Sequence, residues 1–454
     1  MYGRFTRRRF LKQAGAIAAG IGVAMAADDL EWALAQEAGQ PGKVSASERI
    51  VAGFVGMGGM GNYNLADFKR CPEVVVGAVC DVDEGRRNAA ADLAGNKPDV
   101  YNDYRRIIER PDIDVMVIST PDHWHTLPFI HACEAGKDVY VEKPLSLCVK
   151  WGRAMVEAAR RYGRVSQCGT QQRGGTHFQR AVEIVRSGQL GRVSLCRTWI
   201  IGRGGSSGYP ADADPPKGLD WDLWLGPAPS HRYNPARCFG SFRFFWDTAG
   251  GTITDWGTHL IDVVHWAMDV DAPLAAAASG GRYAFDDIFE TPDTMEVLWD
   301  YPGFTALWSL HQANGYPYWF PTSLKPPVQQ DGVTYQAIGG KGYGMVFYGT
   351  NGTMFLDRDG FIITPEGDRM QGVQSGGSEQ HLSHVKDFLC CVKTRERCRS
   401  DVEVAHRSTT APNLANIAYW TGRKVHWDRE NERVIDDPDA DRLTARAMRA
   451  PWHL

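Results

Sequence analysis

The sequence lacks the features that most often mark nucleic-acid-binding, zinc-binding or membrane-spanning chains. Its 50 Lys and Arg residues are fewer than its 54 Asp and Glu residues, and no basic block follows residue 35, which argues against a nucleic-acid partner. The ten cysteines include no C-x-x-C pair and no Cys/His cluster at zinc-ligand spacing, so no metal site is predicted. The apolar run from Ala14 to Ala27 is too short, and too rich in Gly and Ala, to span a bilayer stably.

The cysteines that are present predict mostly buried thiols, because a free cysteine packs as a small apolar residue. Cys390 and Cys391 are adjacent, and Cys398 follows nearby. This pattern leaves one disulfide open as an alternative.

The first 35 residues carry the pattern of an export signal. The basic stretch Arg7-Arg8-Arg9-Phe10-Leu11-Lys12 precedes the apolar run, and Ala33-Leu34-Ala35 offers a small-x-small cleavage site. The twin arginines followed by Phe-Leu-Lys resemble the twin-arginine signal, which implies the twin-arginine export machinery as a partner and a periplasmic or secreted protein. The alternative is a frayed basic N-terminus. We expect residues 36–47 to be a linker.

A glycine-rich turn between two predicted strands is typical of a dinucleotide site. Ile50 to Val55 and Val74 to Cys80 are apolar strands, and Gly56-Met57-Gly58-Gly59-Met60-Gly61 between them fits G-x-G-x-x-G. In this pattern Gly56 allows the tight turn, Gly58 lets the backbone approach a pyrophosphate, and Gly61 lets helix and strand pack closely. The helix that follows offers free N–H groups to phosphate at its start, near Met60.

Asp81 follows the second of these strands, 20 residues after Gly61. Its carboxylate can accept hydrogen bonds from the ribose hydroxyls and would repel a 2′-phosphate. The sequence therefore predicts NAD as the cofactor, with NADP disfavoured.

Strands and helices continue to alternate up to Cys168, and a chain of 454 residues is too long for one ordinary core. The alternation predicts an α/β fold that begins with a doubly wound parallel sheet, a Rossmann domain over residues 48–170. Ligands bind such sheets at the carboxyl ends of the strands. We therefore expect Gly58, Asp81, His125 and Lys143 around one crevice.

Two further motifs carry a family resemblance. The tripeptide Glu142-Lys143-Pro144 ends a predicted strand, and Gly250-Gly251-Thr252-Ile253-Thr254-Asp255-Trp256-Gly257-Thr258-His259 contains a D-x-x-x-H pair. Asp255 and His259 are four apart, so a helix starting there would place them on one face. Together with the glycine turn, these motifs resemble the Gfo/Idh/MocA family, the glucose–fructose oxidoreductase and inositol dehydrogenase group, over residues 50 to about 430.

The resemblance implies a second α/β domain over residues 171–430 with a large open, mostly antiparallel sheet, and a homo-oligomer built on that sheet. A charged tail over residues 431–454 follows, and its Pro451-Trp452 end is expected to dock on a neighbour. The long stretch Asn314–Asp331 is expected to loop over the cleft. The segments that fit strands of the second sheet are Trp199, Tyr283–Phe285, Thr294–Trp299, Thr305–Leu310, Gly344–Tyr348 and Thr353–Leu356.

The resemblance also implies site roles. Lys143, Asp255 and His259 form the catalytic group, in which Asp255 orients His259 or holds a substrate hydroxyl. The residues expected at the cofactor are Gly56, Gly58, Met60, Gly61, Asp81, His125, Glu142 and Gln171. Each has a structural alternative: His259 could line a buried helix, Lys143 could be a solvated strand-end lysine, and His125 could cap a helix. Gln171 and Gln172 could contact either nicotinamide or substrate.

The function that follows is the oxidation of a secondary alcohol on a sugar, polyol or glycoside. Free NAD is scarce outside the cytoplasm, so an exported enzyme would need a tightly retained cofactor. An alternative is NAD-dependent glycoside cleavage by transient oxidation and elimination. The Y-P-T-H-G stretch usual in glycosidases of the family is absent, which weakens that match. A non-catalytic sugar-binding protein is a third hypothesis, disfavoured because Lys143 and His259 are both present.

Overall fold

Six short parallel strands form the first of two sheets in the computed structural model, which describes residues 48–202, 204–315, 328–330, 333–335 and 342–454. Their order is β3-β2-β1-β4-β5-β6, and every neighbouring pair is parallel. β4 and β5 are buried along their whole length, as expected for apolar strands covered on both faces by helices. The strands are β1 (Ile50–Val55), β2 (Val74–Cys80), β3 (Asp99–Tyr101), β4 (Val115–Ile118), β5 (Asp138–Val141) and β6 (Ser166–Cys168).

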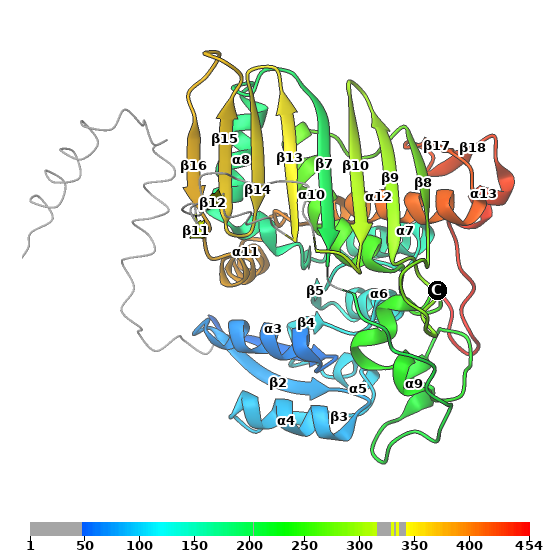
Figure 1. Ribbon diagram of the computed structural model, residues 1–454. Helices are drawn as coiled ribbons and strands as arrows, with labels where there is room; N and C mark the ends of the chain where they lie inside the picture. Colours follow the sequence, from blue (N-terminus) through cyan, green and yellow to red (C-terminus); the bar gives the residue numbers. More distant parts are fainter. Residues whose placement is uncertain (1–47, 203, 316–327, 331–332, 336–341) are drawn as a thin grey trace, which may run out of the picture. The chain divides into compact units, whose positions relative to one another are not determined.

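Helices connect these strands and cover both faces of the sheet (Figure 1). They are α3 (Gly59–Lys69), α4 (Glu84–Ala94), α5 (Arg105–Ile108), the 3₁₀ turn η2 (Asp122–Trp124), α6 (Thr126–Glu134) and α7 (Val149–Arg161). The predicted Rossmann sheet is confirmed. The predicted export signal and linker, residues 1–47, lie outside the described residues, as does most of the predicted loop over residues 314–331.

The second sheet has ten strands in the order β16-β15-β14-β13-β7-β10-β9-β8-β17-β18. β7 and β10 are parallel, and the other neighbours are antiparallel, which confirms the predicted mostly antiparallel sheet. The strands are β7 (Val193–Ile201), β8 (Ala275–Gly281), β9 (Thr294–Tyr301), β10 (Phe304–His311), β13 (Tyr343–Gly349), β14 (Gly352–Asp357), β15 (Gly360–Pro365), β16 (Val373–Gly376), β17 (Val425–Asp428) and β18 (Arg433–Ile435). A separate hairpin pairs β11 (Val328–Gln330) with β12 (Val333–Tyr335).

Helices α8 (Thr176–Arg186), α10 (Thr258–Met268) and α12 (Val402–Thr421) pack on one face of this sheet and share its main core. In α8, Phe178, Ala181, Val182 and Val185 recur three or four residues apart, so one apolar stripe faces the strands. The remaining elements are η3 (Gln171–Gly174), α8 (Thr176–Arg186), α9 (Trp221–Leu225), η4 (Pro235–Arg237), η5 (Phe239–Phe244), the π-helical turn η6 (Ile253–Gly257), α10 (Thr258–Met268), α11 (His381–Thr394), α12 (Val402–Thr421) and α13 (Pro438–Arg442).

Helix α12 belongs to both halves of the molecule. Val402 and Ala405, in its first turn, lie in the core beneath the parallel sheet, whereas Leu414 and Ile417 lie in the core of the large sheet. Between these points, the Thr409 hydroxyl accepts a hydrogen bond from the backbone N–H of Leu145 at 3.2 Å. Residues Ile50–Leu454 accordingly form one unit.

Two segments differ from their predictions. Tyr283–Phe285 is a loop and no strand, because the Asp293 carboxylate accepts the backbone N–H groups of Tyr283, Ala284 and Phe285 at 3.0–3.1 Å and so removes the donors that a sheet needs. Residues 431–454, expected as a tail, contribute β18 and α13. Trp452 packs edge-on against Trp124 of its own chain, with ring centroids 4.8 Å apart, which places it on the Rossmann half. Its docking on a neighbour stays a prediction.

Candidate active site

The glycine turn after β1 has the geometry that the sequence predicts. Gly56 has φ +84°, and a Cβ there would lie 2.7 Å from the backbone of Ser119. A Cβ on Gly61 would lie 1.9 Å from the Gly56 carbonyl oxygen, so the close approach of helix and strand requires glycine at this position. By contrast, a Cβ on Gly59 would meet nothing within 4 Å. The turn therefore leaves open space at the start of α3.

This open space fits a pyrophosphate. Helix α3 begins at Gly59, and its N-cap residue Gly58 offers no side chain to its first N–H groups. Those donors and the positive end of the helix dipole are the usual partners of a phosphate. Gly58 and Met60 both line the cavity that starts here.

Asp81 lies at the end of β2 and also lines the cavity. One carboxylate oxygen accepts the Met57 backbone N–H at 2.6 Å, and the other accepts the Asp83 N–H at 2.9 Å. Burial raises the pKa of Asp81, and these two hydrogen bonds oppose that rise. Because its orientation is fixed by the backbone, the carboxylate can present its remaining lone pairs to a ribose.

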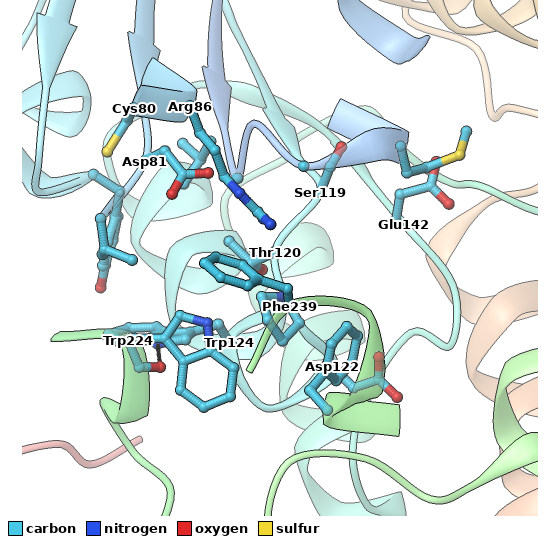
Figure 2. A pocket seen from close by; sticks show the side chains of 18 of the residues that line it. Cys80, Asp81, Arg86, Ser119, Thr120, Asp122, Trp124, Glu142, Trp224 and Phe239 are labelled. Carbon is cyan, nitrogen blue, oxygen red and sulfur yellow. Dashed lines mark hydrogen bonds between the residues drawn. The ribbon is translucent and has the colours of Figure 1, made fainter. Parts of the chain in front are cut away.

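A segment of the second half, residues 218–245, crosses over the cavity and is called the cover segment below. Its backbone bonds to the Rossmann half: the Gly218 carbonyl accepts the Glu84 N–H at 2.9 Å, and the Asp220 N–H donates to Val82 at 3.1 Å. The guanidinium of Arg86 stacks over the Phe239 ring, 3.7 Å from its centroid. Figure 2 shows this stack below Asp81, inside the cavity lining.

Indole contacts fasten the same segment at a second point. Trp124 donates its ring N–H to the carbonyls of Leu223 and Trp224, at 3.1 and 3.0 Å. Trp224 lines the cavity together with Trp124. The cover segment thus contacts the Rossmann half near its start, at residues 218–224, and near its end, at Phe239.

At the inner end of the cavity, Lys143 meets a carboxylate from the second half. Its ammonium forms an ion pair with Asp255 and donates to the Asp255 backbone carbonyl at 3.0 Å. Arg243 lies on the other side of the same carboxylate, with Nε 3.2 Å from Oδ1. Burial alone would raise the pKa of Asp255, but the two cations outweigh it and hold that pKa well below its usual range. Asp255 therefore remains a carboxylate.

The Asp255–His259 motif is positioned by an irregular turn. The predicted single α-helix begins as the π-helical turn η6 and becomes regular only at Thr258; such turns often occur at functional sites. The Asn416 side-chain amide fixes the turn by donating to the Gly250 carbonyl at 2.8 Å. Among the described residues Asp255 makes no hydrogen bond to His259, and its partners are Lys143 and Arg243. The two predicted roles of Asp255, to orient the imidazole or to hold a substrate hydroxyl, stay predictions.

His259 is buried, with 5% of its surface exposed. Burial and the charges of Lys143 and Arg358 hold the pKa of His259 well below its usual range, so the imidazole is neutral. Its Nδ1 has no hydrogen-bond partner in the described structure, and neither polar atom of the buried Gln172 amide has one. Buried polar groups are rarely left unpaired, so these atoms are candidates for contact with a ligand.

Glu142 is a second buried carboxyl group in the cavity lining. Its Oε1 accepts hydrogen bonds from Asn64 and Gln171, both at 3.0 Å, while Oε2 is without a partner. A Cβ on Gly169 would lie 2.6 Å from both carboxylate oxygens, so the strand end is shaped around this group. Gln171 thus acts on the site through Glu142 and is not itself part of the lining.

His125 differs from its prediction. Its Nδ1 lies 2.7 Å from the Pro144 carbonyl and its Nε2 lies 2.9 Å from the Thr120 carbonyl, so both ring nitrogens face backbone carbonyls, and the nitrogen that carries the proton donates to one of them. It occupies the N-cap position of α6 without a side-chain cap. Burial lowers the pKa of His125 to about 4. The residue ties the Thr120 loop to the Lys143-Pro144 loop, a supporting role in place of the expected cofactor contact.

Two charged lining residues near Lys143 had no assigned role in the sequence-based prediction. Asp122 is a buried carboxyl facing Arg243, Lys143 and Asp255, and burial raises the pKa of Asp122 to about 7. Arg243 comes from the 3₁₀ turn η5 of the cover segment. Asp122 carried a weak signal, since it follows strand β4 at the carboxyl edge of the sheet. Arg243 carried none.

The described residues contain one group with metal-ligand proximity, Asp387, Cys391 and Cys398, none of which lines the cavity. His384 precedes Asp387 by three residues, about one turn of α11, and its Nε2 lies 2.8 Å from the Cys168 carbonyl. Within the described part of the chain, no helix has the length and apolar character needed to cross a membrane.

A Rossmann half joined to an open-sheet half, with a lysine–carboxylate pair at the inner end of a dinucleotide cavity, defines an NAD-binding oxidoreductase. Two family models match the chain: "Oxidoreductase family, NAD-binding Rossmann fold" over residues 50–170, and "Oxidoreductase family, C-terminal alpha/beta domain" over residues 198–279 and 373–454. The chain belongs to the Gfo/Idh/MocA oxidoreductase family.

Individual relatives match more narrowly. An alpha-N-acetylgalactosaminidase of Shewanella oneidensis is 31% identical over 201 residues, which cover 41% of this chain and 44% of that protein. The uncharacterized oxidoreductase YrbE of Bacillus subtilis is 29% identical over 33% of this chain and 44% of its own length. The aligned part therefore spans less than half of these curated relatives.

The crystal structure of levoglucosan dehydrogenase with NADH and levoglucosan superposes with a TM-score of 0.63. It is 18% identical and covers 83% of this chain and 99% of its own. At this identity the likeness establishes the shared fold.

Proposed function

We propose that the protein is an NAD-dependent oxidoreductase acting on a secondary alcohol of a sugar, a polyol or a glycoside. The observation that carries the proposal is the Lys143–Asp255–Arg243 cluster at the inner end of the cofactor cavity, within electrostatic range of a neutral His259. An ammonium and a neutral imidazole in one place are the two groups that alcohol oxidation requires, because a proton leaves the hydroxyl while its oxygen becomes negative.

Each residue has a distinct task in this proposal. His259 accepts the hydroxyl proton, which its neutral ring allows. Lys143 stabilises the alkoxide as it develops, and Asp255, braced by Arg243, holds the ammonium in place. Bound NAD supplies the hydride acceptor, which is chemistry that no side chain provides. Asp255 is thus a positioning residue, and the buried amide of Gln172 is available for a substrate hydroxyl.

One observation favours NAD over NADP. The Asp81 carboxylate is fixed at the ribose end of the cavity and would repel a 2′-phosphate. Gly58, Gly59 and the start of α3 would hold the pyrophosphate, and Glu142, supported by Gln171, would lie at the nicotinamide end.

The cover segment favours a cofactor that stays bound between turnovers, since it bonds to the Rossmann half across the cavity. A retained cofactor also suits a second candidate, glycoside cleavage, in which transient oxidation acidifies a neighbouring C–H, elimination releases the aglycone, and the hydride is returned. The relation to an alpha-N-acetylgalactosaminidase supports this alternative. The motif Asp255-Trp256-Gly257-Thr258-His259, which stands in place of Y-P-T-H-G, weakens it.

One experiment separates the two candidates. Nucleotide released from the denatured protein is identified by mass spectrometry, and absorbance of reduced nicotinamide is followed while sugars and glycosides are added. A lasting rise indicates net dehydrogenation, whereas release of an aglycone without net reduction indicates cleavage. If the protein binds no dinucleotide and neither signal appears across the panel, the proposed function is wrong.

We also propose export by the twin-arginine machinery and assembly into a homo-oligomer. The export proposal rests on the residue pattern in 1–35, and replacement of Arg7 and Arg8 by lysine should retain the protein in the cytoplasm of a fractionated host. The assembly proposal rests on the open ten-stranded sheet, and sedimentation of the purified chain tests it. A monomer in sedimentation would contradict it.

A further inference from the structure

Cys391 and Cys398 lie side by side beneath the surface at the end of α11. Both are free thiols with 6% and 4% of their surface exposed. The ligand atoms of these cysteines and of Asp387 all lie within 4.8 Å of one another. A disulfide needs two cysteines brought close by the fold, and this pair meets that requirement.

The backbone explains why the two thiols meet. Helix α11 ends at Thr394, and Arg395 adopts a left-handed conformation with φ +65° while its N–H donates to the Cys391 carbonyl at 2.8 Å. The chain therefore turns back beside the last helical turn. Arg395 is fixed in turn by its ion pair with Asp138 at 2.9 Å, so the reversal is held by tertiary contacts.

A metal site is the other use of such a cluster, and the contacts disfavour it. The Asp387 carboxylate already accepts the Arg399 backbone N–H at 3.0 Å, and the Arg399 guanidinium lies 3.4 Å from its other oxygen. Without this oxygen the described residues offer two sulfur ligands, whereas a structural zinc site uses four ligands. The pair is better suited to sulfur–sulfur chemistry.

We propose that Cys391 and Cys398 form an intramolecular disulfide in oxidising surroundings. In the first step the Cys391 thiolate attacks the disulfide of a small-molecule or protein oxidant, which forms a mixed disulfide and releases one thiolate. In the second step the Cys398 thiolate attacks the Cys391 sulfur and releases the other. Two thiols are oxidised, one disulfide is reduced, and the two protons pass to the released thiolates.

Thiol pairing with Cys398 lowers the pKa of Cys391, which makes Cys391 the attacking sulfur. The neighbouring Cys390 is exposed and lies in a different environment. It is not part of the buried hydrophobic cluster that contains Cys391 and Cys398. It is therefore a natural internal control.

The disulfide would restrict the motion of the segment around Ser400, which supports the candidate active site. Ser400, two residues after Cys398, accepts the backbone N–H of Cys168 at 2.9 Å, and its hydroxyl contacts that of Thr170. Thr170 precedes Gln171, which holds Glu142 in the cavity lining. The disulfide would link this loop covalently to α11, which packs on the Rossmann core.

The test uses the full-length chain and does not depend on activity. The protein is treated with excess oxidised glutathione or with dithiothreitol, denatured, alkylated and mapped by mass spectrometry. We expect the ten alkylated cysteines of the reduced protein to fall to eight after oxidation, with Cys391 and Cys398 joined, and the melting temperature to rise by about 2–5 °C. Cys390→Ser should keep the linkage, whereas Cys391→Ser and Cys398→Ser should each abolish it.

Three results would overturn the proposal. The first is ten alkylated cysteines after oxidation, the second is a linkage that involves Cys390, and the third is stoichiometric zinc that protects both thiols. Because the mapping of the unmodified chain is decisive alone, a variant that fails to fold does not obscure the outcome.

Discussion

The two ends of the cofactor cavity are built in different ways. The phosphate end uses one short stretch, in which β1, the glycine turn, α3 and Asp81 follow each other within residues 50–81. The inner end, called the catalytic end below because we propose that catalysis takes place there, gathers Asp122, Lys143, Arg243 and Asp255 from both halves of the molecule. A contiguous motif fixes its own geometry by local sterics, whereas the dispersed cluster depends on how two halves pack. Mutations at the two ends should therefore have separable effects.

The largest effect is expected at the catalytic end. Lys143→Met should lower turnover by about 1000-fold or more, because the developing alkoxide loses its cation. Nucleotide binding, measured by titration of the purified apoprotein, should change by less than about threefold, since the phosphate end is untouched. Lys217→Met, at an exposed lysine, is the matched control. Wild-type turnover in the Lys143 variant would refute the assignment.

The phosphate end should show the opposite pattern. Gly61→Ala places a Cβ 1.9 Å from the Gly56 carbonyl oxygen, so helix and strand must separate. We expect nucleotide affinity to fall by about 100-fold and the melting temperature to drop by several degrees. Gly59→Ala, whose Cβ meets nothing within 4 Å, should keep the wild-type melting temperature. Equal thermal stability of the two variants would contradict the packing argument.

A smaller effect is expected where the cover segment joins the two ends. Phe239→Ala removes the ring that Arg86 stacks on, and the loss of such a contact should speed nucleotide release by about tenfold. Release can be followed by stopped-flow displacement with excess nucleotide. Tyr209→Ala, at an aromatic that is 67% exposed and outside the cavity lining, serves as control. An unchanged release rate would show that the segment does not retain the cofactor.

The smallest effect concerns pH. Burial raises the pKa of Asp122 to about 7, so the folded chain keeps a proton that the unfolded chain loses near pH 4. The stability that the protonated Asp122 carboxyl contributes is fully present below about pH 4 and is lost as the pH rises towards 7. The Asp122→Asn variant has no carboxyl group to ionise at this position and keeps its stability over this range. The melting temperature of the variant minus that of the wild type should therefore increase by about 3–6 °C between pH 5 and pH 8.

The control for this comparison is Asp214→Asn, at an exposed position. Its melting temperature relative to wild type should show no such dependence on pH. If the difference in melting temperature between Asp122→Asn and wild type also showed no dependence on pH, the Asp122 carboxyl would be ionised in the folded protein and stabilised by Arg243 and Lys143.

Much of the fold was predictable because local patterns decide it. The apolar runs of β1 and β2 and the glycine spacing set the Rossmann unit, and the positions of Gly56 and Gly61 follow from backbone sterics alone. Tyr283–Phe285 was mispredicted because an aromatic run reads as a strand, and the Asp293 side chain that captures its N–H groups lies eight to ten residues away.

The catalytic end was predictable only in part. Lys143, Asp255 and His259 belong to recognisable motifs. Arg243, the second ion-pair partner of Asp255, precedes its motif in a stretch without helical or strand periodicity, so this pairing could not be predicted. His125 has the sequence context of a cofactor ligand, yet two backbone carbonyls occupy its ring. Tertiary packing, which no single segment encodes, decides both cases.

Helix α12 constrains how small molecules enter. Its N-terminal turn is buried in one core and its C-terminal turns in the other, and its 20 residues, with Pro412 among them, span about 30 Å. The two halves cannot separate without exposing one of these cores to water. We therefore expect the rate of cofactor exchange to depend on the contacts of the cover segment more than on the angle between the halves.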